Sequence, residues 1–495
     1  MSALPRPNRG TARPTAAVPR AGLVQYALGS AGMGIYVTVP GLLLLYFLTD
    51  TLGVPPWLAG LALLVPKVVD VVLHPFVGSV SDRDRARNGN RVRVLAAGCL
   101  LAVAFTATFA VPGSAAADPY LAAGWVAVWF VVGNTLFAAY QVPYLATPTD
   151  VDVGYDERTR IMSFRMVVLT LGILVGGALA PLLVGDGSGV SGYVVMALCL
   201  GAFMLVFQAV GVGGVRSLAR AGTAPGGAAE GRAAEGRAAE DGAAAGAVPP
   251  ARAALAQAWS VLRANRSFRV LAGSYLLVST TTHLVLAGLP YFAEYALGRP
   301  GLTTVLVGSF VAPALVATPV WFRISRTLGK QRCLLAAQWA FVLGSLGMLA
   351  GARTGLAVVV LATLVLGVSF AGLQLFPFSM VPDTVRAAGA GEVDRAGAYT
   401  GVWTATEAVG SAAGPYLYSA ALAAGGFAAT RAGEQVAQTA GAHTAVLLGF
   451  TVLPAALMVL SVLAQRRYLL DSDARGRPEH PATDPGAAPG TPREA

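Results

Sequence analysis

Charged residues are scarce in this chain of 495 residues: Asp, Glu, Lys and Arg together make up 12% of it, whereas 55% of the residues are hydrophobic. A soluble protein carries about 25% charged residues. A single globular domain also has too little interior to bury so much apolar surface. The composition therefore excludes an ordinary soluble domain and predicts an all-α polytopic membrane protein.

Cysteine residues and sequence motifs of catalytic sites are scarce as well. Cys99, Cys199 and Cys333 are far apart and have neither zinc-site nor redox spacing, so we interpret them as small core residues. The chain has no phosphate-binding G-x-x-x-x-G-K-[ST] motif. We also find no cluster of metal ligands and no nucleophile beside a base. These absences argue against an enzyme, and we expect no cofactor and no metal.

What the sequence has is a series of twelve apolar segments, each about long enough to cross a bilayer. Because only helices or closed barrels satisfy the backbone in lipid, and these runs are too long for barrel strands, we expect twelve transmembrane helices. They lie near residues 22–49, 57–80, 94–112, 120–145, 162–185, 190–215, 267–296, 302–325, 331–351, 355–381, 396–425 and 442–465.

The segments form two groups of six, which predicts two six-helix bundles over residues 21–216 and 253–468. Residues 217–252 contain the tandem GRAAEGRAAE and read as a flexible cytoplasmic linker. Residues 1–20 lack the pattern of a cleaved signal peptide. Together with residues 469–495, they are expected to be disordered cytoplasmic tails.

The basic residues predict the orientation of the chain. Of the 35 Lys and Arg residues, 31 fall in the tails, the even-numbered loops and the adjoining helix ends. Only Arg299, Arg353 and Arg431 fall in odd-numbered loops, and Lys67 lies within a predicted span. The positive-inside rule then places both termini in the cytoplasm. The net charge of +10 is explained in the same way, so we expect no nucleic-acid partner.

The two halves share a weak internal repeat. A loop ending in Gly89-Asn90-Arg91 follows the second span, and one with Gly329-Lys330-Gln331-Arg332 follows the eighth. Pro75 and Pro319 precede the first loop arginine at similar distances in the two halves. Two related six-helix halves around a cavity in the middle of the membrane are typical of a secondary transporter.

The second span carries three ionisable residues. Lys67, Asp70 and His74 are spaced i, i+3 and i+7, which places them on one face of a helix. Such residues are costly in lipid and mark a pathway or coupling site. Two alternatives remain open: Lys67 and Asp70 could form a purely structural ion pair, and His74 could be a neutral packing residue.

At this point the chain resembles a known family. Gly78-Ser79-Val80-Ser81-Asp82-Arg83 matches the G-x-x-x-D-R motif of the major facilitator superfamily. Further stretches resemble the glycoside–pentoside–hexuronide cation symporters, the group that contains the melibiose permease. They are Tyr26–Gly29, Tyr46–Asp50, Asp70–Arg93, Val142–Tyr144, Asp156–Arg160 with Phe164-Arg165, Val381–Asp383, and Tyr399–Trp403 with Glu407 and Gly410. The resemblance implies alternating access and a cation site on the second helix.

Departures from the family pattern bear on the coupling ion and the substrate. The family has a second acid before the proline of the second helix, where this chain has His74. Imidazole is a poor ligand for sodium and titrates near neutral pH, so we favour proton coupling over sodium coupling. The family's sugar-binding acids on the first and fourth helices correspond to Gly34 and Gln141, and its eleventh-helix lysine to Ala408.

We assign the remaining candidates to two groups. Aromatic, amide and charged residues of the predicted spans are the substrate-binding candidates: Tyr26, Tyr140, Gln141, Tyr144, Arg165, Gln374, Trp403 and Glu407. Charged residues at the cytoplasmic helix ends are the candidates for a cytoplasmic gate: Asp82, Arg83, Arg158 and Asp383. The alternatives are that Arg165 reaches the surface, that Trp403 only packs, and that the end charges only set the topology.

Together these patterns predict a monomeric secondary transporter of the plasma membrane, whose partners are a small molecule and the lipid bilayer. We favour symport of a sugar, glycoside or related polyhydroxy compound with a proton. A proton-coupled exporter of a small amphiphile or natural product is the first alternative. A membrane sensor that does not transport is the second.

Overall fold

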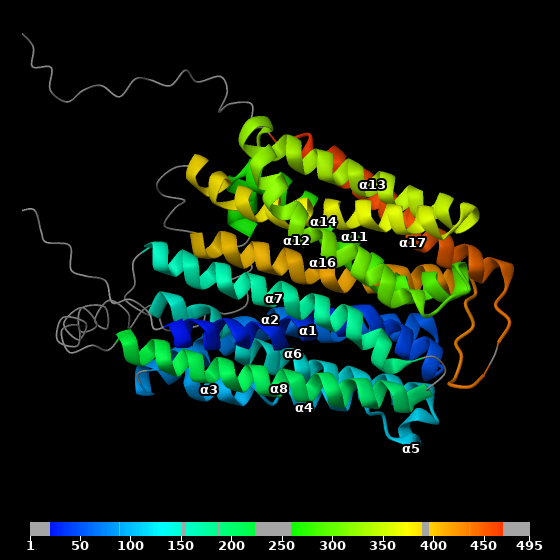
Figure 1. Ribbon diagram of the computed structural model, residues 1–495, viewed down its shortest axis with the longest axis horizontal. Coiled ribbons are helices and arrows are strands. Elements are labelled where there is room, and N and C mark those ends of the chain that lie inside the picture. Colours follow the sequence, from blue (N-terminus) through cyan, green and yellow to red (C-terminus); the bar gives the residue numbers. More distant parts are fainter. Residues whose placement is uncertain are drawn as a thin grey trace, which may run out of the picture.

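The computed structural model describes residues 20–88, 90–150, 155–185, 189–222, 259–388, 396–434 and 436–468. Their regular structure is helical, apart from one isolated antiparallel bridge between Leu52 and Arg431. The helices form two groups, one from each half of the chain, which lie side by side along the long axis of the molecule (Figure 1). The predicted all-α membrane fold is therefore confirmed.

A helix lies at each of the twelve predicted spans. In the first half the helices are α1 (Arg20–Tyr46), η1 (Phe47–Thr51), α2 (Pro56–Asn88), α3 (Val92–Gly98), α4 (Leu101–Phe109), α5 (Gly113–Ala116), α6 (Pro119–Asp150), α7 (Tyr155–Val184) and α8 (Gly189–Gly222). In the second half they are α11 (Arg266–Tyr291), η2 (Phe292–Ala296), α12 (Leu302–Leu328), α13 (Lys330–Thr354), α14 (Leu356–Ala387), α16 (Ala396–Ala424) and α17 (Ala440–Gln465).

Ten helical stretches are long and apolar enough to cross a membrane, within the part of the chain that the structure describes. Helices α2 and α16 are not among the ten. These two helices carry the ionisable residues Lys67, Asp70 and Glu407, and they pack against each other across the two halves. These ionisable residues therefore lie on two helices that meet between the halves.

The third predicted span differs from a single helix. It is built from α3 and α4, with a turn at Cys99 and Leu100, where the amides of both residues bond the carbonyls three positions before them. Gly98 lies against α6 here: a Cβ on it would be 2.6 Å from the Tyr140 backbone nitrogen. The helix tightens where this close approach leaves no room for a side chain.

Another difference concerns the end of the first half. The predicted linker begins at residue 217, but α8 continues to Gly222. Leu218 is fully buried and joins the core formed by Tyr26, Tyr140 and Tyr144. The helix is prolonged because this leucine adds apolar contact to the bundle. Helix α1 already begins at Arg20, the last residue of the predicted N-terminal tail. The rest of that tail, the rest of the predicted linker and the predicted C-terminal tail lie outside the described residues.

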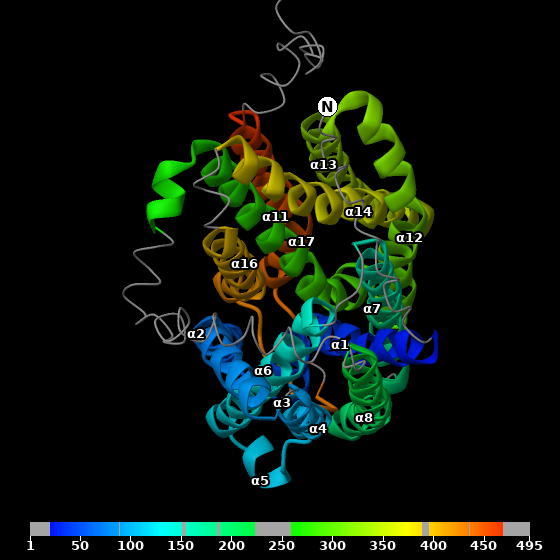
Figure 2. The ribbon, with the colours of Figure 1, turned by 90° about the vertical axis from the view of Figure 1, so that its left-hand side faces the viewer.

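Within the first half, α1 packs closely on α7 and α8 (Figure 2). Gly34 of α1 faces the backbone of α7 at Leu169, and Gly172 of α7 faces the backbone of α1 at Ala31. Glycine permits this approach because any Cβ at either position would meet main-chain atoms. Small residues at helix contacts are the usual means of packing helices in a membrane.

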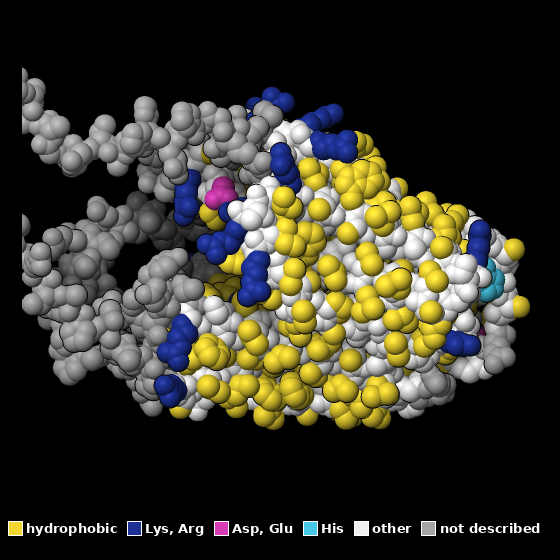
Figure 3. All heavy atoms as spheres, turned by 45° about the horizontal axis from the view of Figure 1, so that its top comes forward, with side chains coloured by type: hydrophobic (Ala, Val, Ile, Leu, Met, Phe, Trp, Pro, Cys, Tyr) yellow, Lys and Arg dark blue, Asp and Glu magenta, His cyan; other side chains and the backbone are white. Residues whose placement is uncertain are grey.

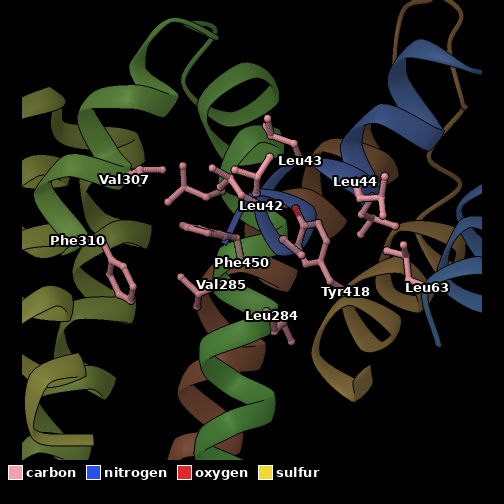
Figure 4. Close-up of a cluster of buried hydrophobic side chains, with 14 of the residues drawn as sticks. Leu42, Leu43, Leu44, Leu63, Leu284, Val285, Val307, Phe310, Tyr418 and Phe450 are labelled. Atoms are coloured by element: carbon pink, nitrogen blue, oxygen red, sulfur yellow. The ribbon is translucent and has the colours of Figure 1, made fainter. Parts of the chain in front are cut away.

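The two halves meet along three helix pairs, α1 with α11, α2 with α16, and α7 with α12. Leu42, Leu43 and Leu44 of α1 lie among apolar side chains of the second half, including Leu284 of α11 and Tyr418 of α16 (Figure 4). All five side chains are buried. This cluster makes one continuous core out of the two bundles.

The surface divides into a middle zone and two ends. Large apolar side chains cover the middle zone in the view of Figure 3. Most visible Lys and Arg side chains gather at one end, which we call the arginine-rich end. The opposite end, which we call the distal end, contains α5 and the loop between α16 and α17. This pattern is that of a membrane-embedded protein.

Candidate functional site

The centre of the molecule holds the ion pair expected from the spacing on α2. The Lys67 Nζ atom lies 3.8 Å from the Asp70 Oδ2 atom, and the Asp70 side chain is 7% exposed. The Lys67 ammonium also lies over the Phe130 ring, 5.7 Å from its centroid. The side chain of His74, the third predicted coupling residue, lies outside the described residues, so its role stays a prediction.

Lys67 also acts across the boundary between the halves. Its charge acts on Glu407 of α16 and on His283 of α11. Glu407 accepts a hydrogen bond from the Tyr275 hydroxyl, and its carbonyl oxygen accepts one from Ser279 Oγ at 3.1 Å. Lys67 therefore pairs with Asp70 of its own half, and its charge also acts on Glu407 of the second half.

His283 of α11 also belongs to this central group, although it was not among the site candidates from sequence. Its Nδ1 atom lies 2.8 Å from the Ser279 carbonyl oxygen. Because a carbonyl can only accept, Nδ1 is the donor, and Nε2 of a neutral imidazole is then an acceptor. A sequence signal exists: Tyr275, Ser279 and His283 are spaced by four residues and share one helix face.

An aromatic cluster borders Glu407. The Trp403 ring stacks on the Tyr275 ring with centroids 4.2 Å apart and also meets Phe378 edge-on. Trp403 is 4% exposed, and its Nε1 atom has no hydrogen-bond partner among the described residues. Trp403 is therefore a packing residue, which was one of the two interpretations from sequence. Its indole N–H is still a donor that a ligand could use. Gln374 of α14 is exposed.

The three tyrosines proposed as substrate ligands lie inside the first half. The Tyr26 and Tyr144 rings stack at 4.4 Å, and each hydroxyl bonds the other residue's carbonyl oxygen. The Tyr140 hydroxyl donates to the Gln208 carbonyl oxygen at 3.1 Å. All three side chains are fully buried, and Gln141 is half-buried. In this conformation the tyrosines are core residues, so their role in binding substrate stays a prediction.

Arg165 of α7 does not reach the surface. It is 7% exposed, and its guanidinium lies over the Tyr144 ring, 5.8 Å from the centroid. Its Nη1 atom contacts the Met166 sulfur at 3.5 Å, and its Nε atom has no partner among the described residues. A buried guanidinium without a carboxylate partner is costly. Such a group fits a ligand that supplies acceptor oxygens.

The predicted cytoplasmic gate is only partly within the described residues. Asp383 of α14 pairs with Lys330 of α13 at 2.6 Å, and Lys330 also donates to the Ser379 carbonyl oxygen. This pair joins two helices of the same half. Arg83 is exposed, and the side chains of Asp82 and Arg158 lie outside the described residues. A gate formed by these four residues stays a prediction.

A cavity of about 630 Å³ lies at the distal end, away from the central ion pair. Both halves line it, with Asp50 and Tyr193 from the first and Glu294, Tyr295 and Arg431 from the second. None of the five was among the predicted site residues.

Solved structures of transporters share this fold. A bacterial homologue of the human lysosomal transporter Spinster, in an inward-facing and occupied conformation, aligns with a TM-score of 0.61 at 15% identity, over 92% of this chain and 96% of that one. At this identity the likeness shows the fold alone. It agrees with the two six-helix halves seen here.

Several relatives in the sequence comparison are named as symporters. The uncharacterized symporter sll1374 of Synechocystis is 31% identical over 164 residues, 32% of this chain and 29% of that protein. The uncharacterized symporter YnaJ of Bacillus subtilis is 23% identical over 457 residues, 90% and 91% of the two chains. The sodium-dependent lysophosphatidylcholine symporter 1 of Xenopus tropicalis is 28% identical over 162 residues, 32% and 30% of the chains.

A family model described as MFS/sugar transport protein matches residues 25–228 and 239–472. The match covers both bundles, and so includes the α2 ion pair, Arg165, and the Glu407 region opposite them. The expected major facilitator membership is confirmed. The chain belongs to the MFS/sugar transport protein family and is a secondary transporter.

Proposed function

We propose that this protein imports a sugar, glycoside or related polyhydroxy compound together with a proton, by alternating access. The observation that carries the proposal is the central group, in which Lys67 pairs with Asp70 at 3.8 Å and its charge also acts on Glu407 of the other half. A group shared in this way changes when the halves move relative to each other. Binding of an ion there can therefore be linked to the direction in which the protein opens.

The charge balance of this group supports cation coupling. When His283 is neutral and both carboxylates are ionised, Lys67, Asp70 and Glu407 together carry a net charge of −1. An uncompensated charge in a protein interior is costly, so the group favours one added monovalent cation. A proton meets this need on either carboxylate or on His283. Sodium would need several further oxygen ligands.

The residues around Glu407 support a polyhydroxy substrate. The Glu407 carboxylate accepts a hydrogen bond from Tyr275, and the Trp403 indole N–H has no partner among the described residues. Donors and acceptors of this kind pair with sugar hydroxyl groups. The description of the matching family model, which names sugar transport, favours the same substrate class.

The basic residues support the orientation that import requires. The tails and even-numbered loops with their adjoining helix ends hold 31 basic residues, and the odd-numbered loops hold 3. By the positive-inside rule, the arginine-rich end and both termini then face the cytoplasm. The distal end then faces outwards across the plasma membrane. Transport from the distal end to the arginine-rich end would be uptake.

Uptake by proteoliposomes tests the proposal. Purified protein is reconstituted, and accumulation of a panel of labelled sugars and glycosides is measured under an imposed pH gradient, acidic outside. We expect accumulation of at least one of these compounds that a protonophore abolishes. A sodium gradient at fixed, equal pH is the matched control. Uptake driven by sodium, with no response to the pH gradient, would contradict proton coupling.

Arg165 favours a second candidate, the proton-coupled export of a small amphiphile with an anionic group. The buried guanidinium has no carboxylate partner among the described residues, and phosphate or carboxylate oxygens would supply one. The name of the Xenopus relative refers to a phospholipid substrate. Thermal stabilisation of the purified protein by lysophospholipids but not by sugars would favour this candidate, and the reverse result would exclude it.

A further inference from the structure

Two segments at the distal end repeat the same pattern. Tyr46-Phe47 at the end of α1 is followed by Leu52-Gly53, and Tyr291-Phe292 at the end of α11 is followed by Leu297-Gly298. Both segments form one turn of π-helix, η1 and η2. Both end at a glycine with positive φ, +68° at Gly53 and +63° at Gly298. The repeat therefore gives the two halves the same irregular turn, and π-turns often occur at functional positions.

The two π-turns are joined by reciprocal hydrogen bonds. The Tyr46 hydroxyl donates to Glu294 Oε2, and the Tyr295 hydroxyl donates to Asp50 Oδ1. Each half thus supplies one tyrosine donor and one carboxylate acceptor. Hydrogen bonds to charged acceptors are stronger than bonds between neutral groups. We call these four residues the distal lock.

The loop between α16 and α17, which belongs to the second half, also forms hydrogen bonds with the η1 turn. Thr430 Oγ1 donates to Asp50 Oδ1 at 3.0 Å, and the Thr430 amide donates to the Thr49 carbonyl oxygen at 2.8 Å. The Ala432 amide donates to the Thr51 carbonyl oxygen at 3.0 Å. Asp50 therefore accepts from two side chains of the opposite half.

The distal lock borders the 630 Å³ cavity, which all four of its residues line. Beneath it lies the apolar cluster of Leu42, Leu43 and Leu44 with residues of the second half (Figure 4). Water that enters the cavity can solvate the carboxylates and tyrosine hydroxyls when they separate. A polar lock next to a cavity can consequently open and close again. Opening a seal made only of apolar side chains would cost more free energy, because water does not compensate for their lost contacts.

We propose that the distal lock is the gate that holds this end of the transporter closed, and that its two tyrosine–carboxylate pairs set the ratio of distal-closed to distal-open protein. The gate acts in the resting protein, whichever substrate and coupling ion are transported. Loss of one hydroxyl is expected to raise the distal-open to distal-closed ratio about ten-fold, the value of one hydrogen bond of about 1.4 kcal/mol. Loss of both is expected to raise it further.

The rate of cysteine alkylation measures this ratio even when the open form is rare. The three native cysteines are replaced by alanine, and Leu44→Cys is introduced, because Leu44 is fully buried beneath the lock. A membrane-impermeant maleimide is added to intact cells and, separately, to inside-out vesicles. The exposed Ser114→Cys near the lock identifies which preparation presents the distal end to the reagent.

Tyr46→Phe and Tyr295→Phe, in the Leu44→Cys background, remove the hydroxyls and keep the rings. Each is expected to accelerate alkylation about ten-fold, and the double variant more. Tyr193→Phe is the matched control, because this hydroxyl lies in the same cavity but bonds Thr51 of its own half. Glu294→Gln keeps an acceptor oxygen without the charge, so a smaller acceleration is expected.

Unchanged rates in both tyrosine variants, or an equal acceleration in Tyr193→Phe, would overturn the proposal. The unfolding temperature of each variant is measured in parallel. If a tyrosine variant unfolded at a lower temperature than Tyr193→Phe, its faster alkylation could reflect lost stability. The alkylation rate of Glu294→Gln would then distinguish the two causes, because that change alters the lock without removing any packing atoms. The assay needs neither substrate nor ion gradient, so it can fail or succeed independently of the proposed import.

Discussion

The two ends of the molecule are held together in different ways. At the distal end, hydrogen bonds cross between the halves, as in the Tyr46–Glu294 and Tyr295–Asp50 pairs. At the arginine-rich end, the described Lys330–Asp383 pair stays within one half. Contacts that cross the boundary must break when the halves move, whereas contacts within one half move with it. The first kind should therefore control alternation, and the second kind should control only stability.

Lys67→Met tests the comparison with the largest expected effect. Lys67 pairs with Asp70 and also acts on Glu407 of the other half. Removal of the ammonium leaves two acids in the centre without a cation, and breaking a buried pair costs about 3 kcal/mol or more. We expect a lower unfolding temperature and no accumulation of substrate. Lys67→Met with Asp70→Asn should recover stability but not accumulation; recovery of both would show that the pair is only structural.

Gly34→Leu tests a contact within the first half. A side chain at Gly34 would collide with the α7 backbone at Leu169 and Gly172. Overpacking of this kind costs about 1–3 kcal/mol or more, so we expect less protein in the membrane and a lower unfolding temperature. Gly124→Leu on α6 is the control, because no atom lies within 4 Å of a Cβ there. Equal losses in both variants would contradict the packing account.

Arg165→Gln sharpens the comparison, since the described contacts of Arg165 lie within its own half and yet Arg165 should affect transport. Removal of a buried charge that has no carboxylate partner among the described residues is expected to leave the unfolding temperature unchanged or slightly higher. Loss of charge-assisted hydrogen bonds of about 1.5 kcal/mol to a ligand should weaken substrate binding about ten-fold. Isothermal titration calorimetry measures the affinity of Arg165→Gln for substrate, and Arg165→Lys is the control that keeps the charge. Normal binding by Arg165→Gln would remove Arg165 from the site.

Asp383→Asn should have the smallest effect. Both partners of the Lys330–Asp383 pair are 40% exposed, and an ion pair of this kind contributes between about 0 and 1 kcal/mol. We expect an almost unchanged unfolding temperature and unchanged alkylation of Leu44→Cys at the distal end. A marked acceleration of alkylation would show that contacts within one half also govern alternation.

The membrane fold was predictable from sequence because lipid requires long apolar helices, and their length is visible in the chain. The ends of the helices were less predictable. The turn between α3 and α4 depends on Gly98 meeting the backbone of α6, and the prolonged α8 depends on the burial of Leu218. Both causes are tertiary contacts, which apolar periodicity along one segment does not contain.

The candidate site was predictable only where the signal is local. The i, i+3 spacing of Lys67 and Asp70 predicted their pairing on α2. The contribution of His283 and the reciprocal bonds of Glu294 depend on helices far apart in sequence. Tyr26, Tyr140 and Tyr144 have the composition of a binding surface, but the packing of α1 on α8 buries them.

Coupling of a cation to transport by the central acids is the central claim, and Asp70→Asn tests this coupling most directly. Wild-type and variant protein are reconstituted side by side, and the same vesicles are used to measure accumulation under a pH gradient and exchange at equal pH. The account predicts that Asp70→Asn loses accumulation while exchange partly persists, because the site still binds substrate but no longer links it to a cation. Normal accumulation by Asp70→Asn would contradict it.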